Sequence, residues 1–221
     1  MIKAVVWDMD GVIVDSEHQW RLCEAELFRR YVAKWGDEDH DKIVGMGVED
    51  LYLHLVKNYG VKGSLEAFLK ECHELASLVY GKRVSITKGF REAIEDLRRN
   101  GLKLGLASSS PRAWIDQVLE RFELKGKFEA EACADDVPKG RTKPEPDLYL
   151  LACARLGIEP KDALAVEDSV YGVAAAKRAG LLCAAFRSGH NDEQDLKKAD
   201  FEVRALSELA YDGISTILKE S

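Results

Sequence analysis

Helix-like and strand-like patterns alternate along the chain from Lys88 onward. Short apolar runs alternate with segments whose apolar residues recur at helical spacing. Parallel strands need a crossover connection, usually a helix, so this alternation predicts a parallel sheet that helices cover on both faces. We therefore predict an α/β fold, a doubly wound parallel sheet with a Rossmann-like core.

The expected elements follow from these patterns. Strands are predicted over residues 4–7, 103–107, 129–133, 163–166 and 181–186. Helices between and after them are predicted over residues 90–97, 115–122, 146–156, 169–179 and 206–218.

The segment between the first strand and this alternating region has a different character. Residues 17–31, 48–59 and 65–80 show helical periodicity, with no strand-like run between them. We predict that residues 17–84 form a small all-helical cap domain inserted into the core. Residues 1–16 and 85–221 then make up the Rossmann-like catalytic core.

Two carboxylates, Asp8 and Asp10, directly follow the first predicted strand. Side chains alternate along an extended chain, so the two acids can share one side, although the turn at Gly11 can splay them. Ligands of open parallel sheets bind outside the carboxyl ends of the strands, so other motifs that follow strands are expected nearby. Two acids in such a place favour a bound cation.

Three further motifs follow such strands or lie beside them. Ser108, Ser109 and Ser110 follow the predicted strand 103–107, where a hydroxyl and backbone N–H groups at the start of a helix can bind an anion. We expect Ser110 to serve only as the N-cap of that helix. Lys143 begins the segment Lys143-Pro144-Glu145-Pro146-Asp147, in which prolines alternate with acids after the lysine.

The last motif is Glu167-Asp168 at the end of the predicted strand 163–166. Neighbouring acids on an extended end point to opposite sides, so we expect Asp168 to bind a metal directly and Glu167 to support it through water. Magnesium prefers such a site, with few carboxylates, several waters and phosphate oxygens.

Together these four motifs resemble those of the haloacid dehalogenase-like hydrolase superfamily, over essentially the whole chain. The segment from Asp8 to Ser16 resembles its beta-phosphoglucomutase-like and phosphoglycolate phosphatase-like branch. The resemblance implies a cytoplasmic phosphatase that acts on a small phosphorylated metabolite, with magnesium (Mg²⁺) as cofactor.

The resemblance also implies a role for each motif residue. Asp8 would attack phosphorus to form an aspartyl-phosphate, and Asp10 would act as acid and base. Phosphate would be bound by Ser108, Ser109 and Lys143. The metal ligands would be Asp8, Asp10 through its carbonyl, Glu167 and Asp168. One extra residue before Pro144 leaves Lys139 and Arg141 as alternative cations to Lys143.

Two other functions stay open. Phosphosugar mutases of the branch carry a histidine where this chain has Trp20, and a cap arginine that residues 45–49 do not supply. Hydrolysis is therefore favoured over a mutase. A noncatalytic phosphometabolite-binding protein is the third alternative, and the retained Asp10 argues against it.

Candidate residues of the cap that could select the substrate are His18, Trp20, Met46, Glu49 and Lys70. The other histidines, His40, His54, His73 and His190, are expected to be ordinary surface or core histidines.

Composition and net charge limit the kinds of partner that the chain is expected to bind. The net charge of −7, from 32 basic and 39 acidic residues, opposes nucleic-acid binding. No apolar run approaches the about 20 residues of a membrane helix, and no leader precedes the first strand, so no membrane partner is expected. Five scattered cysteines suggest a reducing cytoplasm. We expect a monomer or a weak homodimer.

Overall fold

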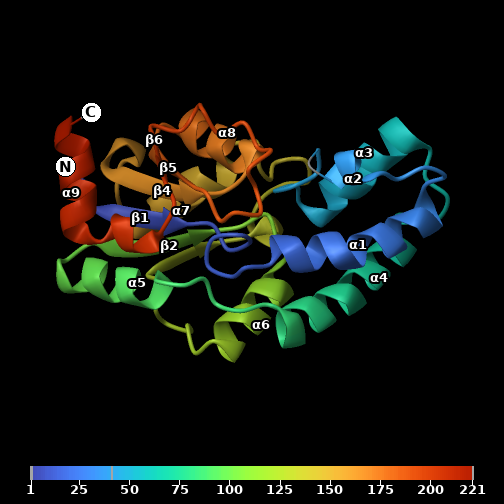
Figure 1. Cartoon of the computed structure of the whole chain (residues 1–221), viewed down its shortest axis with the longest axis horizontal. Helices are drawn as coiled ribbons and strands as arrows, with labels where there is room; N and C mark the ends of the chain where they lie inside the picture. Colours follow the sequence, from blue (N-terminus) through green and yellow to red (C-terminus); the bar gives the residue numbers. More distant parts are fainter. Residues whose placement is uncertain (1, 41, 221) are drawn as a thin grey trace.

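A parallel six-stranded sheet forms the centre of the molecule (Figure 1). The computed structural model describes residues 2–40 and 42–220. The strands are β1 (Ala4–Trp7), β2 (Lys103–Ala107), β3 (Ala130–Ala132), β4 (Ala163–Glu167), β5 (Leu182–Phe186) and β6 (Phe201–Val203). Their order is β3-β2-β1-β4-β5-β6, and all are parallel. The predicted doubly wound α/β fold is confirmed.

Alternate residues of β1 face the two sides of the sheet. Val5 and Trp7 pack in the same apolar cluster as helices α5 (Phe90–Arg99) and α6 (Arg112–Arg121). Ala4 and Val6 pack against α7 (Asp147–Leu156) and α8 (Val170–Ala179). Figure 1 shows α5 and α8 on opposite sides of the sheet. Both faces of the sheet are therefore covered.

The remaining helices differ in detail from the predictions. They are α1 (Glu17–Tyr31), α2 (Asp37–His40), α3 (Val48–Tyr59), α4 (Leu65–Leu78) and α9 (Tyr211–Glu220), with a π-helical turn η1 (Val79–Arg83) and 3₁₀ turns η2 (Ala134–Asp136), η3 (Pro160–Asp162) and η4 (Leu206–Leu209). The predicted helix 206–218 is split into η4 and α9, because Ala210 is extended with ψ 158°. Strand β6 and helix α2 were not predicted, since elements of three or four residues carry too little periodicity.

The helices of residues 17–84, called here the helical segment, lie beyond the end of the sheet toward which β1 runs (Figure 1). Phe28 and Phe68 of this segment belong to the same continuous apolar cluster as Trp7. No helix among the described residues is both long and apolar enough to span a membrane. The helical segment thus stands over the carboxyl end of the strands, where the predicted site residues follow β1, β2 and β4.

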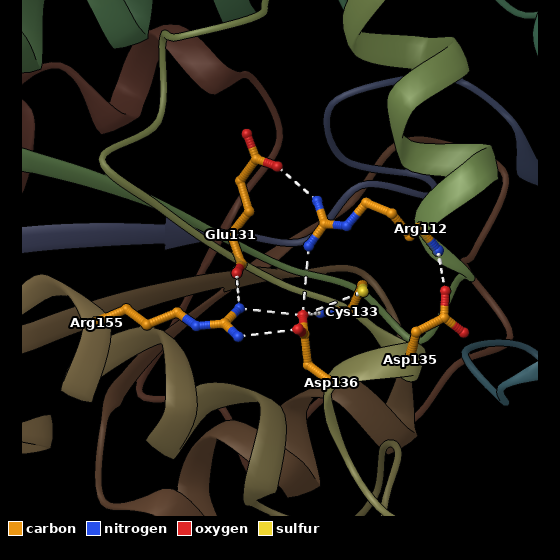
Figure 2. A network of polar contacts seen from close by, with 6 residues as sticks. All are labelled: Arg112, Glu131, Cys133, Asp135, Asp136 and Arg155. Atoms are coloured by element: carbon orange, nitrogen blue, oxygen red, sulfur yellow. Dashed lines mark hydrogen bonds and ion pairs between the residues drawn. The ribbon is translucent and has the colours of Figure 1, made fainter.

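A polar network fixes the connection that leaves β3 (Figure 2). Asp136 of η2 accepts hydrogen bonds from Arg155 at 2.8 Å and from the Cys133 N–H at 2.9 Å. Arg112 pairs with Glu131 at 2.6 Å and with Asp136 at 3.3 Å. The network joins the start of α6, the end of β3 and α7, and it anchors the loop that carries Lys143.

The network predicts a pH-dependent contribution to stability. Hydrogen bonds from Arg155 hold the pKa of Asp136 well below its usual range. The contribution of Asp136 to the free energy of unfolding is therefore fully present above about pH 3.9, the pKa of an aspartate in the unfolded chain. It is lost as the pH falls through the lower pKa that Asp136 has in the folded protein. We expect Asp136→Asn to lower the free energy of unfolding by about 1–3 kcal/mol at pH 7, and by progressively less below about pH 4. Urea unfolding at several pH values measures both, with the exposed Asp195→Asn as control. A deficit independent of pH would contradict this account.

Candidate active site

Three buried acids converge at the carboxyl ends of β1 and β4. Asp8 follows β1, Glu167 ends β4, and Asp168 comes next. The two strands are paired neighbours at the point where the strand order reverses, which is where open α/β sheets bind ligands. One ligand atom from each acid lies within 4.8 Å of the others. The fold therefore concentrates negative charge at one edge of the sheet.

Lys143 partly neutralises this charge. Its Nζ lies 2.6 Å from Asp8 Oδ1 and 2.6 Å from Glu167 Oε1, and the residue is only 2% exposed. Burial alone would lower the pKa of Lys143, but the carboxylates of Asp8 and Glu167 raise it above its ordinary value. Lys143 is thus an ammonium held against Asp8.

The two alternative cations lie elsewhere. Lys139 is exposed and pairs with Glu49 at 2.9 Å, and Arg141 pairs with Asp147 at 2.8 Å. Of the three candidate cations, Lys143 is therefore the one that contacts Asp8.

The acids suit a hard divalent cation. Three carboxylates against one ammonium carry a formal charge of −2 when ionised. Asp168 Oδ2 is buried without a hydrogen-bond partner, and a Cβ on Gly11, whose φ is +72°, would lie 1.9 Å from it. Burial raises the pKa of Asp8 and Asp168 well above the ordinary value, and neighbouring acids add to the effect. A cation such as Mg²⁺ would relieve this repulsion.

The acids are not equivalent as ligands. Glu167 Oε1 already accepts a hydrogen bond from Tyr149 at 2.6 Å and faces Lys143. Asp8 and Asp168 are therefore the better candidates for direct ligands. The supporting role expected of Glu167 stays a prediction.

The Asp10 side chain lies outside the three-acid group and points to hydroxyls. Its Oδ1 accepts hydrogen bonds from Tyr80 at 2.6 Å and Ser16 at 2.8 Å, and its Oδ2 accepts one from Ser110 at 2.9 Å. A contribution of Asp10 to a metal would thus come from its carbonyl. The prediction that Ser110 is only an N-cap is wrong, because Pro111 occupies the N-cap position and the Ser110 hydroxyl binds Asp10.

The other two serines lie beside Asp8 and Asp10 in the same cavity. Ser108 is 1% exposed, and its Oγ accepts a hydrogen bond from the Ser110 N–H at 3.0 Å. Ser109 Oγ is buried and has no hydrogen-bond partner.

Apolar side chains of the helical segment line the cavity together with Asp8, Asp10, Lys143 and the three serines. The candidate selectors Trp20 and Met46 line it, whereas His18, Glu49 and Lys70 line other hollows. His40, expected as an ordinary surface or core histidine, is buried but also lines the cavity.

Sequence reasoning missed several side chains that hold the site. Tyr80 binds Asp10, and Tyr149 binds Glu167. Buried Asn191 donates to the Asp168 carbonyl at 2.7 Å. Each of these residues lies far along the chain from its partner, so no local sequence pattern predicts the contact.

Comparison with known proteins agrees with this geometry. Residues 2–180 match the haloacid dehalogenase-like hydrolase family. The chain belongs to this family. The resemblance seen in its motifs is thereby confirmed, and the enzyme is a hydrolase as predicted.

Relatives of this haloacid dehalogenase-like hydrolase include named phosphatases. A phosphorylated carbohydrates phosphatase of Thermotoga maritima is 34% identical over 180 residues, covering 81% of this chain and 82% of the relative. Hexitol phosphatase B of Escherichia coli is 30% identical, covering 94% of each chain. The crystal structure of CbbY from Rhodobacter sphaeroides in complex with phosphate matches with a TM-score of 0.83 at 22% identity, covering 97% of this chain and 100% of that one. This last likeness shows the shared fold.

The three-acid site predicts a specific response to magnesium. Mg²⁺ should raise the melting temperature, since a ligand at 100 times its Kd stabilises a protein by about 2.7 kcal/mol. Asp168→Asn should lose this response, yet be at least as stable as the native chain in EDTA, because it removes an unpaired buried charge. Thermal unfolding with Mg²⁺ and with EDTA measures both, with the exposed Asp116→Asn as control. A full magnesium response in Asp168→Asn would contradict the assignment.

Proposed function

We propose that this hydrolase is a magnesium-dependent phosphatase that acts on a small phosphorylated metabolite, a sugar phosphate or related phosphomonoester. The observation that carries the proposal is Asp8, which Lys143 holds beside two further acids and which lines the same cavity as Ser108 and Ser109. The names of the two phosphatase relatives support the same substrate class.

The proposed reaction has two steps at Asp8. An Asp8 carboxylate oxygen attacks phosphorus, and the bond to the leaving oxygen breaks as Asp10 gives that oxygen a proton. Water then attacks the aspartyl-phosphate, Asp10 takes its proton, and the bond between Asp8 and phosphorus breaks. Lys143 and the hydroxyls of Ser108 and Ser109 would hold the phosphoryl oxygens.

Magnesium, bound at Asp8, Asp168 and the Asp10 carbonyl, would supply positive charge that lets an anionic nucleophile meet an anionic ester. The unpaired Asp168 oxygen and the net negative charge of the cluster support this cofactor.

The hydroxyls around Asp10 suit a group that alternates between acid and base. A hydroxyl can donate to a carboxylate and accept from a protonated carboxyl, so Ser16, Tyr80 and Ser110 can support both states. Tyr80 comes from the helical segment. We assign residues 17–84 as a cap over a core of residues 1–16 and 85–221, with Tyr80 linking cap position to Asp10.

Trp20 supports hydrolysis over transfer to a second sugar. It donates a hydrogen bond to the Tyr80 hydroxyl at 3.1 Å and stacks on Trp114 at 5.4 Å. An indole held in this way offers no acid or base to a sugar acceptor, so water is the proposed acceptor.

The proposed compartment of the protein is the reducing cytoplasm. The five cysteines are free thiols, which supports this proposal.

Phosphate release from a panel of sugar phosphates, with and without Mg²⁺, tests this function. The native chain should turn over at least one of them only with Mg²⁺. Asp8→Asn should lower kcat by at least about 10³-fold, because it removes the nucleophile, while circular dichroism stays native. Asp116→Asn, which changes an exposed carboxylate, should keep full activity. Undiminished turnover by Asp8→Asn would sink the covalent mechanism.

The loss of kcat on removing the Tyr80 hydroxyl should depend on the leaving group of the substrate. Tyr80→Phe removes one hydrogen bond to Asp10, and such a bond to a charged group is worth about 1.5–3 kcal/mol, so kcat for alkyl phosphates should fall about 10–100-fold. p-Nitrophenyl phosphate, whose leaving group needs little protonation, should lose less. Tyr59→Phe, which removes a similar bond to Asp39, is the matched control. Equal losses on both substrates would contradict the role.

A further inference from the structure

Helix α1 places two acids in its buried stripe. Trp20, Leu27 and Phe28 of this stripe are buried, and Glu17 and Glu24 line the same cavity at helical spacing. Seven residues span two turns, so Glu24 lies about 10 Å further along the helix than Glu17. Acids in such a stripe are costly unless they have partners.

His40 of α2 is the partner of both acids. Its Nδ1 lies 3.2 Å from Glu24 Oε2, and its Nε2 lies 3.9 Å from Glu17 Oε2. All three side chains are at least 86% buried. Burial alone would lower the pKa of His40, but the nearby carboxylates of Glu24 and Glu17 raise it above its ordinary value. Glu24 therefore already balances the positive charge that His40 carries when protonated.

The cavity offers little to a second anionic group. Among the described residues that line it, Lys143 is the single lysine or arginine, and Asp8 and Glu167 engage it. Arg21 also acts on His40, but it lines a neighbouring hollow. Carboxyl groups and an imidazole in an otherwise apolar wall can exchange hydrogen bonds with hydroxyls.

We propose that Glu24, held by His40, is a specificity-determining residue that binds hydroxyls of an uncharged leaving group. The enzyme then hydrolyses sugar and sugar-alcohol monophosphates and selects against sugar bisphosphates and phosphorylated carboxylic acids. This inference rests on the proposed phosphatase function and names the substrate class of that site.

The native chain provides the first test. kcat/KM for sorbitol 6-phosphate should exceed that for fructose 1,6-bisphosphate and for phosphoglycolate by at least about tenfold, the factor that 1.4 kcal/mol supplies. A preference for either of the substrates that carry a second anionic group would overturn the proposal without any variant.

Glu24→Gln provides the second test, because it keeps the shape of the side chain and removes its charge. Relative to acetyl phosphate, whose leaving group is small, kcat/KM for sorbitol 6-phosphate should fall at least tenfold, mainly through KM. The ratio of bisphosphate to monophosphate kcat/KM should rise, because His40 then keeps only the more distant carboxylate of Glu17 as a counter-charge. Glu26→Gln, on the same helix and 82% exposed, should behave as the native chain.

The two levels of proposal fail in different ways. If no phosphate ester, acetyl phosphate included, is hydrolysed in an Asp8-dependent manner, the phosphatase function fails. If acetyl phosphate is hydrolysed but Glu24→Gln changes all substrates alike, only the role of Glu24 is overturned.

Discussion

Negative charge gathered at the carboxyl ends of β1 and β4 is the constraint on which the site depends. The parallel register brings Asp8 beside Glu167 and Asp168, and Lys143 is buried between the first two. Removing one partner of a buried ion pair costs about 3–5 kcal/mol, so Lys143 supports the structure as well as the charge balance. Close packing fixes Glu167 too, because a Cβ on Gly172 would lie 1.8 Å from its Oε2.

The same geometry links the helical segment to the chemistry. Tyr80 joins it to Asp10, and Thr142, next to Lys143, donates a hydrogen bond to Asp50 of α3. A movement of the helical segment would therefore change the contacts of Asp10, the proposed acid, and those of Thr142 beside Lys143, the proposed phosphate-binding lysine. Proton transfer by Asp10 in the proposed function and substrate selection by Glu24 in the further proposal depend on one placement of these helices.

Most of the fold and the motif residues could be predicted because their signals are local. Strand 103–107 was predicted with its observed bounds, and Asp8, Ser108 and Asp168 each directly follow a strand. The hydrogen bonds of Ser110, Tyr80 and Tyr149 could not be predicted, because they depend on packing between distant elements. The contacts of His40 could not be predicted for the same reason, because only the tertiary structure brings Glu17 and Glu24 close to it.

The covalent role of Asp8 is the central claim, and trapping its phosphoryl intermediate tests it most directly. The Asp10→Asn variant, slowed in activating water, would be mixed with Mg²⁺ and p-nitrophenyl phosphate, whose leaving group needs little protonation, quenched in acid, and digested for mass spectrometry. The account predicts one added phosphoryl group on the peptide that contains Asp8, and none after chase with hydroxylamine, which cleaves acyl phosphates. Phosphate release by this variant with no adduct at Asp8, or an adduct on another residue, would contradict it.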